Sequence, residues 1–269
     1  MNTFKKYLKQ SATYRIFTSL SKIFVDFTDT VGKIVQIGWH VIKCILKGEI
    51  DWKEVIVQCD RFGISSLPIT LSIVGMTSII VASQVANEMV KQGGSNFVGM
   101  LMTILIVREV GAVMSGFALT SMIGSSLASE IATMRVTEQV DAIDVLGVDS
   151  IRYLFVPRVL SGAIMMPFVV VVASVVGVLL GAVTSDWFAG LSYRAYFASA
   201  GNGLYMKDLW VCILKAITFG ASIALISCTT GYYASGGAKG VGEATTKAVV
   251  WSFNSIVLFD MVFAVLFFF

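Results

Sequence analysis

Five stretches of this sequence are each long and apolar enough to cross a lipid bilayer. They lie at about residues 63–86, 97–123, 155–183, 208–230 and 248–269. A helix needs about 20 predominantly apolar residues to span the hydrocarbon. The composition agrees, because 56% of the residues are hydrophobic and only 14% are charged, against about 25% charged residues in soluble proteins. The sequence therefore predicts an all-α membrane protein with five transmembrane helices.

The first sixty residues follow a different pattern. Eight polar side chains recur at alternating spacings of three and four, which places them on one stripe of a helix. They are Lys22, Asp26, Asp29, Lys33, Gln36, His40, Lys43 and Lys47. A long helix with a wide apolar side and a basic polar stripe is typical of a helix lying in the membrane surface. We therefore predict that residues 1–60 form an interfacial region on the cytoplasmic side, with residues 21–47 in the membrane plane, and that residues 61–269 form the five-span domain. A sixth span with a polar groove is the alternative.

A charged insert, Gly124 to Pro157, separates the second and third apolar segments. It holds seven ionisable side chains within 23 residues, and charge inside the hydrocarbon is costly. The insert therefore belongs outside the membrane. We predict one or two short cytoplasmic helices between Gly124 and Gly147 that dock an ATPase, and a solvated connecting loop is the alternative. The candidate coupling residues are Glu130, Arg135, Glu138, Asp141 and Asp144.

The positive charges predict the orientation of the chain. Fifteen lysines and arginines fall before the first span, in the charged insert or at its edge, or near residues 231–247, and only Lys91, Arg194 and Lys207 fall on the opposite side. Short loops rich in lysine and arginine stay on the cytoplasmic side. The N-terminus is therefore expected in the cytoplasm and the C-terminus in the periplasm, in a multi-pass protein of the cytoplasmic (inner) membrane.

Four charged residues lie inside the predicted spans. Arg108 and Glu109 are near the middle of the second, Lys215 is in the outer half of the fourth, and Asp260 is in the outer half of the fifth. Charge at such depth is rare and indicates function. Neighbours on a helix point about 100° apart, so Arg108 and Glu109 need other partners. We predict the pairs Glu109–Lys215 and Arg108–Asp260 in one cluster bordering a site for a charged headgroup. A network that only fixes helix register is the alternative.

Other motifs argue against catalysis by this chain. The cysteines Cys44, Cys59, Cys212 and Cys228 form no CxxC pair, and His40 has no ligand partner at metal spacing, so we expect no metal site. No Ser/His/Asp or Cys/His arrangement can be assembled. The glycine-rich segment 231–247 lacks the spacing of a phosphate-binding loop. We expect no cofactor in this chain, no nucleic-acid partner, and ATP bound by a partner ATPase.

Small residues recur at helical spacing in two spans. Gly177 and Gly181 form a GxxxG pair, and Gly220, Ala224 and Cys228 repeat the interval of four. Such stripes let helices approach closely in lipid. The spacing alone leaves open whether the contacts are internal or between two copies.

The chain resembles the Mla-type lipid-transport permeases, the MlaE/YrbE-like membrane subunits of ABC transporters. The resemblance extends from about residue 60 to the C-terminus and is most specific between residues 108 and 158. The matching pieces are Arg108–Gly111, Gly124–Ser125, Ala128–Glu130, Met134–Gln139, Asp141–Ala142, Asp149–Arg152, Val156–Arg158, Gly240–Gly242 and Ala244–Thr246.

The resemblance implies a homodimeric permease that binds an ABC ATPase pair through a coupling helix at about residues 126–147. It also implies a ring of MCE-domain proteins on the periplasmic side, a STAS-domain subunit in some assemblies, and a phospholipid or related lipid as substrate. Arg108, Glu109 and Lys215 match the family's lipid pocket. Two other functions stay open on the residues themselves: an ABC importer permease for a small polar solute, and a membrane scaffold that transports nothing.

Overall fold

The computed structural model describes residues 12–48 and 50–268, and within these residues the chain forms helices joined by short turns, with no strand. Residues 1–11, Glu49 and Phe269 lie outside the described part, and so do the predictions that concern them. Five helical segments in the described part are long and apolar enough to cross a membrane. The prediction of an all-α protein with five spans is therefore confirmed.

Each span is longer than its apolar stretch, and two are assembled from several helices. The first joins α3 (Trp52–Phe62), η1 (Ile64–Ser66) and α4 (Leu67–Lys91). The second joins η2 (Ser95–Phe97), α5 (Val98–Leu105), η3 (Ile106–Val110), α6 (Gly111–Leu119), η4 (Thr120–Gly124) and α7 (Ser125–Val136). The last three are α9 (Ser150–Ala189), α11 (Met206–Tyr232) and α12 (Gly237–Phe268).

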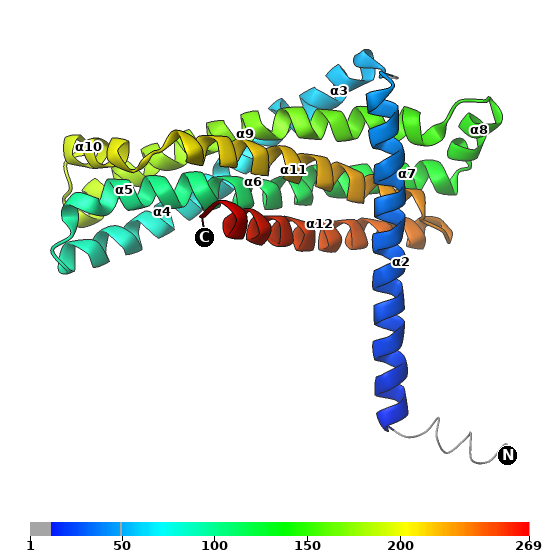
Figure 1. The fold of residues 1–269 in the computed structure, drawn as a ribbon, viewed down its shortest axis with the longest axis horizontal. Coiled ribbons are helices and arrows are strands. Elements are labelled where there is room, and N and C mark those ends of the chain that lie inside the picture. Colours follow the sequence, from blue (N-terminus) through cyan, green and yellow to red (C-terminus); the bar gives the residue numbers. More distant parts are fainter. Residues whose placement is uncertain (1–11, 49, 269) are drawn as a thin grey trace.

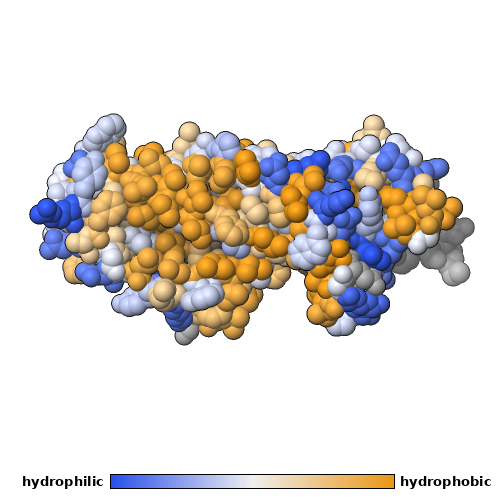
Figure 2. Space-filling view, turned by 90° about the horizontal axis from the view of Figure 1, so that it is seen from above, coloured by the Kyte–Doolittle hydropathy of each residue, from blue (hydrophilic) through white to orange (hydrophobic). Residues whose placement is uncertain are grey.

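The two short helices lie at opposite ends of the bundle (Figure 1). They are α8 (Gln139–Val145), between the second and third spans, and α10 (Tyr193–Gly203), between the third and fourth. The second span has 42 residues, or about 63 Å at about 1.5 Å per residue, twice the thickness of the hydrocarbon at about 30 Å. Part of it must project from the membrane. Figure 2 shows apolar side chains over the middle of the bundle and polar ones gathered at both ends.

The N-terminal helix α2 (Ala12–Leu46) runs across the direction of the spans near the α8 end (Figure 1). It contacts α9 and α11, and Ile37, Val41 and Cys44 are the buried ones among its described side chains. Its outward side exposes large apolar groups, among them Val35, Trp39 and Leu46, at 61–82%. An amphipathic helix with this orientation fits a place at the membrane surface, and its location in the membrane plane stays a prediction. The side chain of Lys22, one of the predicted polar stripe, lies outside the described part.

The small-residue stripes make internal contacts. A Cβ at Gly220 would clash with the carbonyl oxygen of Gly162, so α11 and α9 touch backbone to backbone. A Cβ at Gly177 would stand 2.7 Å from Ser78 Oγ on α4, and one at Gly181 would stand 2.9 Å from the Tyr196 hydroxyl on α10. These glycines therefore allow close packing within one copy of the chain. Their spacing in the sequence did not distinguish such internal contacts from contacts between two copies.

Gly220→Ala should destabilise the bundle by about 1–3 kcal/mol, the usual cost of an added methyl group in a close-packed contact. Gly242→Ala is the matched control, because that glycine is also helical and has no neighbouring atom within 4 Å of a built Cβ. Thermal unfolding of the purified variants in detergent measures both. Equal transition temperatures for the two variants would contradict the close contact.

Candidate functional site

A buried ammonium group joins three spans. Lys215 on α11 has no exposed side-chain surface, and its Nζ lies 3.1 Å from a carboxylate oxygen of Glu109 and 2.6 Å from one of Asp260. The same Nζ donates a hydrogen bond of 2.8 Å to the carbonyl oxygen of Arg108. The expected contact between Glu109 and Lys215 is present, and Asp260 of α12 shares the same lysine.

Arg108 has a different partner from the one that we expected. Its guanidinium pairs with Asp208, at 3.0 Å from Nε to a carboxylate oxygen, so the predicted pair with Asp260 is wrong. Asp208 lies in the first turn of α11, where the helix dipole favours a carboxylate. Sequence reasoning passed over Asp208 because it stands at the edge of the apolar stretch. The useful signal would have been the length of the arginine side chain, which lets a charge reach toward the membrane surface.

The backbone at Arg108 and Glu109 explains how both reach α11. The two residues lie in η3, a π-helical turn inside the second span, and such turns occur often at functional sites. Their partners, Asp208 and Lys215, are seven residues apart, which is two turns on one face of α11 and about 10 Å along its axis. The side chain of Arg108 therefore extends toward the start of α11 while that of Glu109 meets Lys215 deeper in the span.

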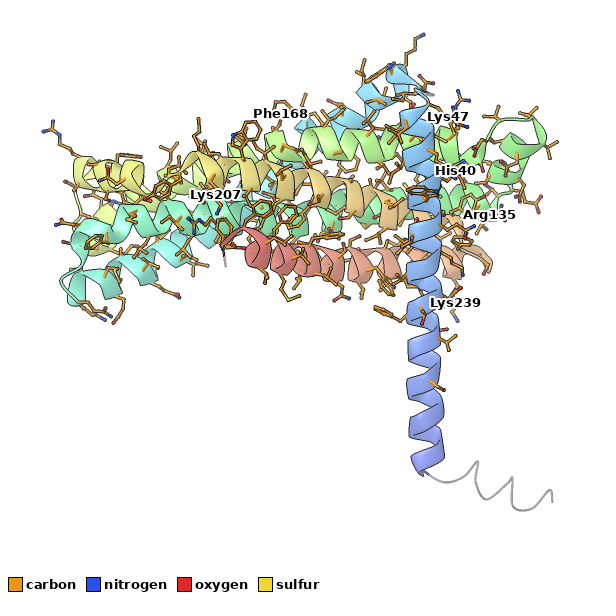
Figure 3. All side chains as sticks on the ribbon, in the orientation of Figure 1. His40, Lys47, Arg135, Phe168, Lys207 and Lys239 are labelled. Carbon is orange, nitrogen blue, oxygen red and sulfur yellow. The ribbon has the colours of Figure 1, made fainter. Side chains whose placement is uncertain are left out.

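The outer edge of this cluster is more open than its centre. The side chain of Arg108 is 27% exposed while that of Lys215 is 0% exposed. Its guanidinium carbon lies 4.4 Å from the centre of the Phe268 ring, and Lys207 Nζ lies 5.8 Å from the same ring. Figure 3 shows Lys207 well away from the end of the bundle that carries Arg135. The side chain of Glu109, at 39%, is also partly exposed. Of these two open members of the cluster, Arg108 is the one whose positive charge attracts an anion.

An apolar cavity of about 430 Å³ adjoins the cluster, between the second span, α9, α10 and α11. Val107 and Cys212 belong to its lining, next to Arg108 in sequence and one turn from Lys215. The hydroxyls of Thr103 and Ser174 also line it and have no hydrogen-bond partner among the described residues. A volume of this size is typical of small-ligand pockets.

The charged insert forms α7 and α8 at the other end of the bundle. The first of these continues the second span, so only α8, seven residues long, is a separate helix. Glu130 on α7 accepts hydrogen bonds from Arg61, at 2.9 Å, and from Arg158, at 2.6 Å. These contacts tie α7 to α3 and α9, so Glu130 is held inside the bundle by long-range partners that the sequence did not reveal.

The other candidate coupling residues lie around the turn into α8. Arg135 pairs with Asp141 and lies over the ring of Tyr232 at 5.5 Å. Asp144 accepts a hydrogen bond from the backbone N–H of Ser150, at 3.1 Å. Glu138 is exposed and has φ 61°, a left-handed conformation that is rare for residues other than glycine, asparagine and aspartate. Backbone strain of this kind occurs at functional sites.

Apolar side chains extend this exposed surface beyond α8. Val145 and Leu146 are 87% and 80% exposed. Large apolar groups so open to solvent, beside the acidic groups of Glu138, Asp141 and Asp144, are typical of a surface that another protein covers.

Asp149 anchors α2 to the turn that follows α8. It caps α9 by accepting hydrogen bonds from the N–H groups of Ile151 and Arg152, and it bonds His40 at 2.7 Å. Partial burial raises the pKa of the Asp149 carboxyl, but the hydrogen bonds from His40 and the backbone, with the charge of His40, outweigh it and leave the pKa below its ordinary value. This carboxyl is therefore ionised at neutral pH.

Comparison with known proteins identifies relatives over most of the chain. Residues 55–266 match the family model of the permease MlaE. The chain is 35% identical to the chloroplastic protein TRIGALACTOSYLDIACYLGLYCEROL 1 of Arabidopsis thaliana, over 86% of this chain and 66% of that protein. It is 36% identical to a probable ABC transporter permease of Synechocystis sp., over 79% and 81% of the two chains, and 34% identical to another of Rickettsia prowazekii, over 93% and 96%.

Lys215→Met should destabilise the protein by about 3–5 kcal/mol, because it leaves two carboxylates without their shared partner inside the bundle. The triple variant Lys215→Met, Glu109→Gln, Asp260→Asn should recover most of this loss, since no unpaired charge remains. Thermal unfolding in detergent compares the two with the unchanged protein. If the triple variant were no more stable than the single one, the side chains would not form one charge-coupled unit.

Proposed function

Because this chain belongs to the MlaE permease family, we propose that it is the membrane subunit of an ABC transporter that moves a phospholipid or related lipid between the inner membrane and an MCE-type partner on the periplasmic side. ATP is bound and hydrolysed by a separate ATPase subunit, and this chain supplies the path for the lipid. The single observation that carries the proposal is the partly exposed Arg108 near an apolar cavity between the second span, α9, α10 and α11.

A lipid needs two unlike surfaces, and the cluster and its cavity supply both. The cavity accepts hydrocarbon, because its lining is almost entirely apolar. Arg108 offers a planar guanidinium, which binds a phosphate through two parallel hydrogen bonds. The name of the Arabidopsis relative is also that of a galactolipid, which supports a lipid as the substrate class.

Arg108 can engage a phosphate without exposing the centre of the cluster. We propose that the headgroup replaces Asp208 as the partner of Arg108, while Lys215 stays between Glu109 and Asp260 and keeps the three spans in register. The exposures favour this division, because Arg108 is partly open and Lys215 is closed. A small polar solute would lose its hydrogen bonds to water in the adjoining apolar cavity, so the cavity favours a lipid over such a solute.

The proposed positions of the partner proteins rest on exposed apolar and acidic side chains and on the family resemblance. A second copy is proposed against α12, where Met261, Val265 and Leu266 are 58–70% exposed. The ATPase is proposed to dock on α8 and the turn around it, with Glu138, Asp141 and Asp144 toward it. From the family resemblance, the MCE-domain ring is proposed at the α10 end, opposite α8, and a STAS-domain subunit is proposed with the ATPase.

Arg108→Lys should keep the protein folded, since a lysine still pairs with Asp208, and should lower the phospholipid that stays bound on purification by about tenfold, because the ammonium cannot form the two-bond contact. The double variant Arg108→Gln, Asp208→Asn removes the same group without leaving a charge unpaired and should lose as much. Mass spectrometry of the co-purified lipids measures both.

Arg194→Gln on α10 is the matched control for this test, because Arg194 is exposed and outside the cluster. It should retain the lipid of the unchanged protein. Full phospholipid occupancy in the Arg108 variants would rule out the proposed headgroup contact, and a small polar solute bound in place of lipid would favour an importer.

Glu138→Asn should weaken binding of the ATPase subunit on the order of tenfold, the effect of one lost interfacial charge pair. Asparagine tolerates the left-handed backbone, so the turn into α8 persists and only the charge is removed. Glu138→Lys should weaken binding further, since it reverses the charge. Pull-down of the ATPase and ATP hydrolysis by the assembled complex measure the effect, with Glu88→Gln at the opposite end as control. Unchanged affinity in Glu138→Lys would contradict a role for this charge.

A further inference from the structure

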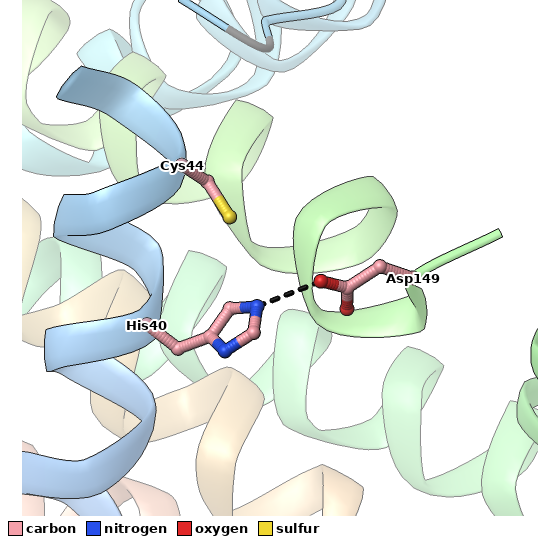
Figure 4. A group of neighbouring side chains, drawn as sticks. All are labelled: His40, Cys44 and Asp149. Carbon is pink, nitrogen blue, oxygen red and sulfur yellow. Dashed lines mark hydrogen bonds and ion pairs between the residues drawn. The ribbon is translucent and has the colours of Figure 1, made fainter. Parts of the chain in front are cut away.

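Three side chains of metal-ligating type meet where α2 crosses the start of α9 (Figure 4). His40 and Cys44 lie four residues apart on α2, so they project from the same face one turn apart. Asp149 is 109 residues from His40 in the sequence and caps the N-terminus of α9. One ligand atom of each, the imidazole nitrogen, the sulfur and a carboxylate oxygen, lies within 4.8 Å of the other two.

The ligand atoms lie no more than 4.8 Å apart, so each distance would change by about 1.5 Å or less to hold an ion. Ligand atoms around a tetrahedral zinc ion are about 3.3–3.8 Å apart, given bond lengths of about 2.0–2.3 Å. The His40 Nε2 and the Asp149 Oδ2 are now 2.7 Å apart, so they would open by less than about 1 Å. The other oxygen of Asp149 is fixed by the N–H groups of Ile151 and Arg152, which act as the outer hydrogen bonds that orient a metal ligand.

The set of donor atoms selects the class of ion. A nitrogen, a thiolate sulfur and a carboxylate oxygen are all zinc ligands, whereas magnesium and calcium take oxygen ligands. Three protein ligands leave a fourth position for water. Cys44 is 5% exposed while His40 and Asp149 remain accessible, so an ion has a path from solvent on the side of the imidazole and the carboxylate.

We propose that His40, Cys44 and Asp149 form a binding site for a zinc-type divalent cation that clamps α2 to the turn between α8 and α9. On binding, the Cys44 thiol releases its proton to solvent, and the His40 Nε2 presents its lone pair while the ring proton resides on Nδ1. The ion then replaces the hydrogen bond between His40 and Asp149. This inference stands apart from the proposed lipid transport, and it departs from our expectation of no metal site, which rested on spacing along the chain alone.

The clamp would link two parts of the molecule with separate roles. One is α2, whose exposed apolar side fits the membrane surface, and the other is the segment that carries α8. With the ion bound, α2 moves only together with the start of α9. A bound ion would therefore couple the position of α2 to that of α8, where the ATPase is proposed to dock.

Cobalt(II), a spectroscopic substitute for zinc, tests the site in the full-length protein purified in detergent and stripped with chelator. We expect one equivalent to bind and to give the thiolate-to-cobalt charge-transfer band in the near ultraviolet, which zinc should then abolish by displacement. Cys44→Ser should remove the band. Asp149→Asn, which still caps α9, and His40→Gln should each weaken cobalt binding at least about tenfold.

Cys59→Ser is the matched control, because Cys59 is a partly exposed free cysteine on α3 outside the cluster. Its variant should keep the band and the affinity of the unchanged protein. No charge-transfer band in the unchanged protein, or a band that survives Cys44→Ser, would overturn the proposal and leave His40 and Asp149 as an ordinary hydrogen-bonded pair.

Discussion

The buried ammonium of Lys215 is the constraint on which the arrangement of the spans depends. A charge at the centre of a membrane helix costs about 2.5–3.5 kcal/mol on insertion scales, and Lys215 has no exposed surface through which water could solvate it. Its two carboxylate partners come from the second and the fifth spans. Those spans must therefore keep their depth relative to α11. The backbone contact of Gly220 with Gly162 adds the third span to the same unit.

The π-helical turn at Ile106–Val110 separates two uses of neighbouring charges. It presents Glu109 to the buried ammonium of Lys215 and Arg108 to Asp208 at the start of α11, near the apolar cavity. Two adjacent charges thus have different partners: Glu109 helps to fix the bundle, and Arg108 is the one proposed to bind a headgroup. At the far end, the contacts of Glu130 with Arg61 and Arg158 tie α7 to two other spans, so a force applied at α8 would reach the whole bundle.

Much of this architecture can be predicted from the sequence, because apolar runs of the required length and the amphipathic pattern of residues 21–47 are local signals. The Glu109–Lys215 contact can be predicted from the sequence because unpaired charges in lipid are costly. Asp208 was missed since its position at the edge of an apolar run hides its role, and a π-helical turn has no clear sequence signal. The ion pairs of Glu130 cannot be predicted from local sequence, because its arginine partners are 28 and 69 residues away. The meeting of His40 and Cys44 with Asp149 depends on α2 crossing α9, which no spacing along the chain reveals.

Native mass spectrometry of the permease assembled with its ATPase tests the central claim most directly, namely that this chain carries a phospholipid in the path beside Arg108. The account predicts a defined number of phospholipid molecules that survive washing with a delipidating detergent and are released when ATP is added. A permease that retains no phospholipid, or one whose bound phospholipid is unaffected by ATP, would contradict it.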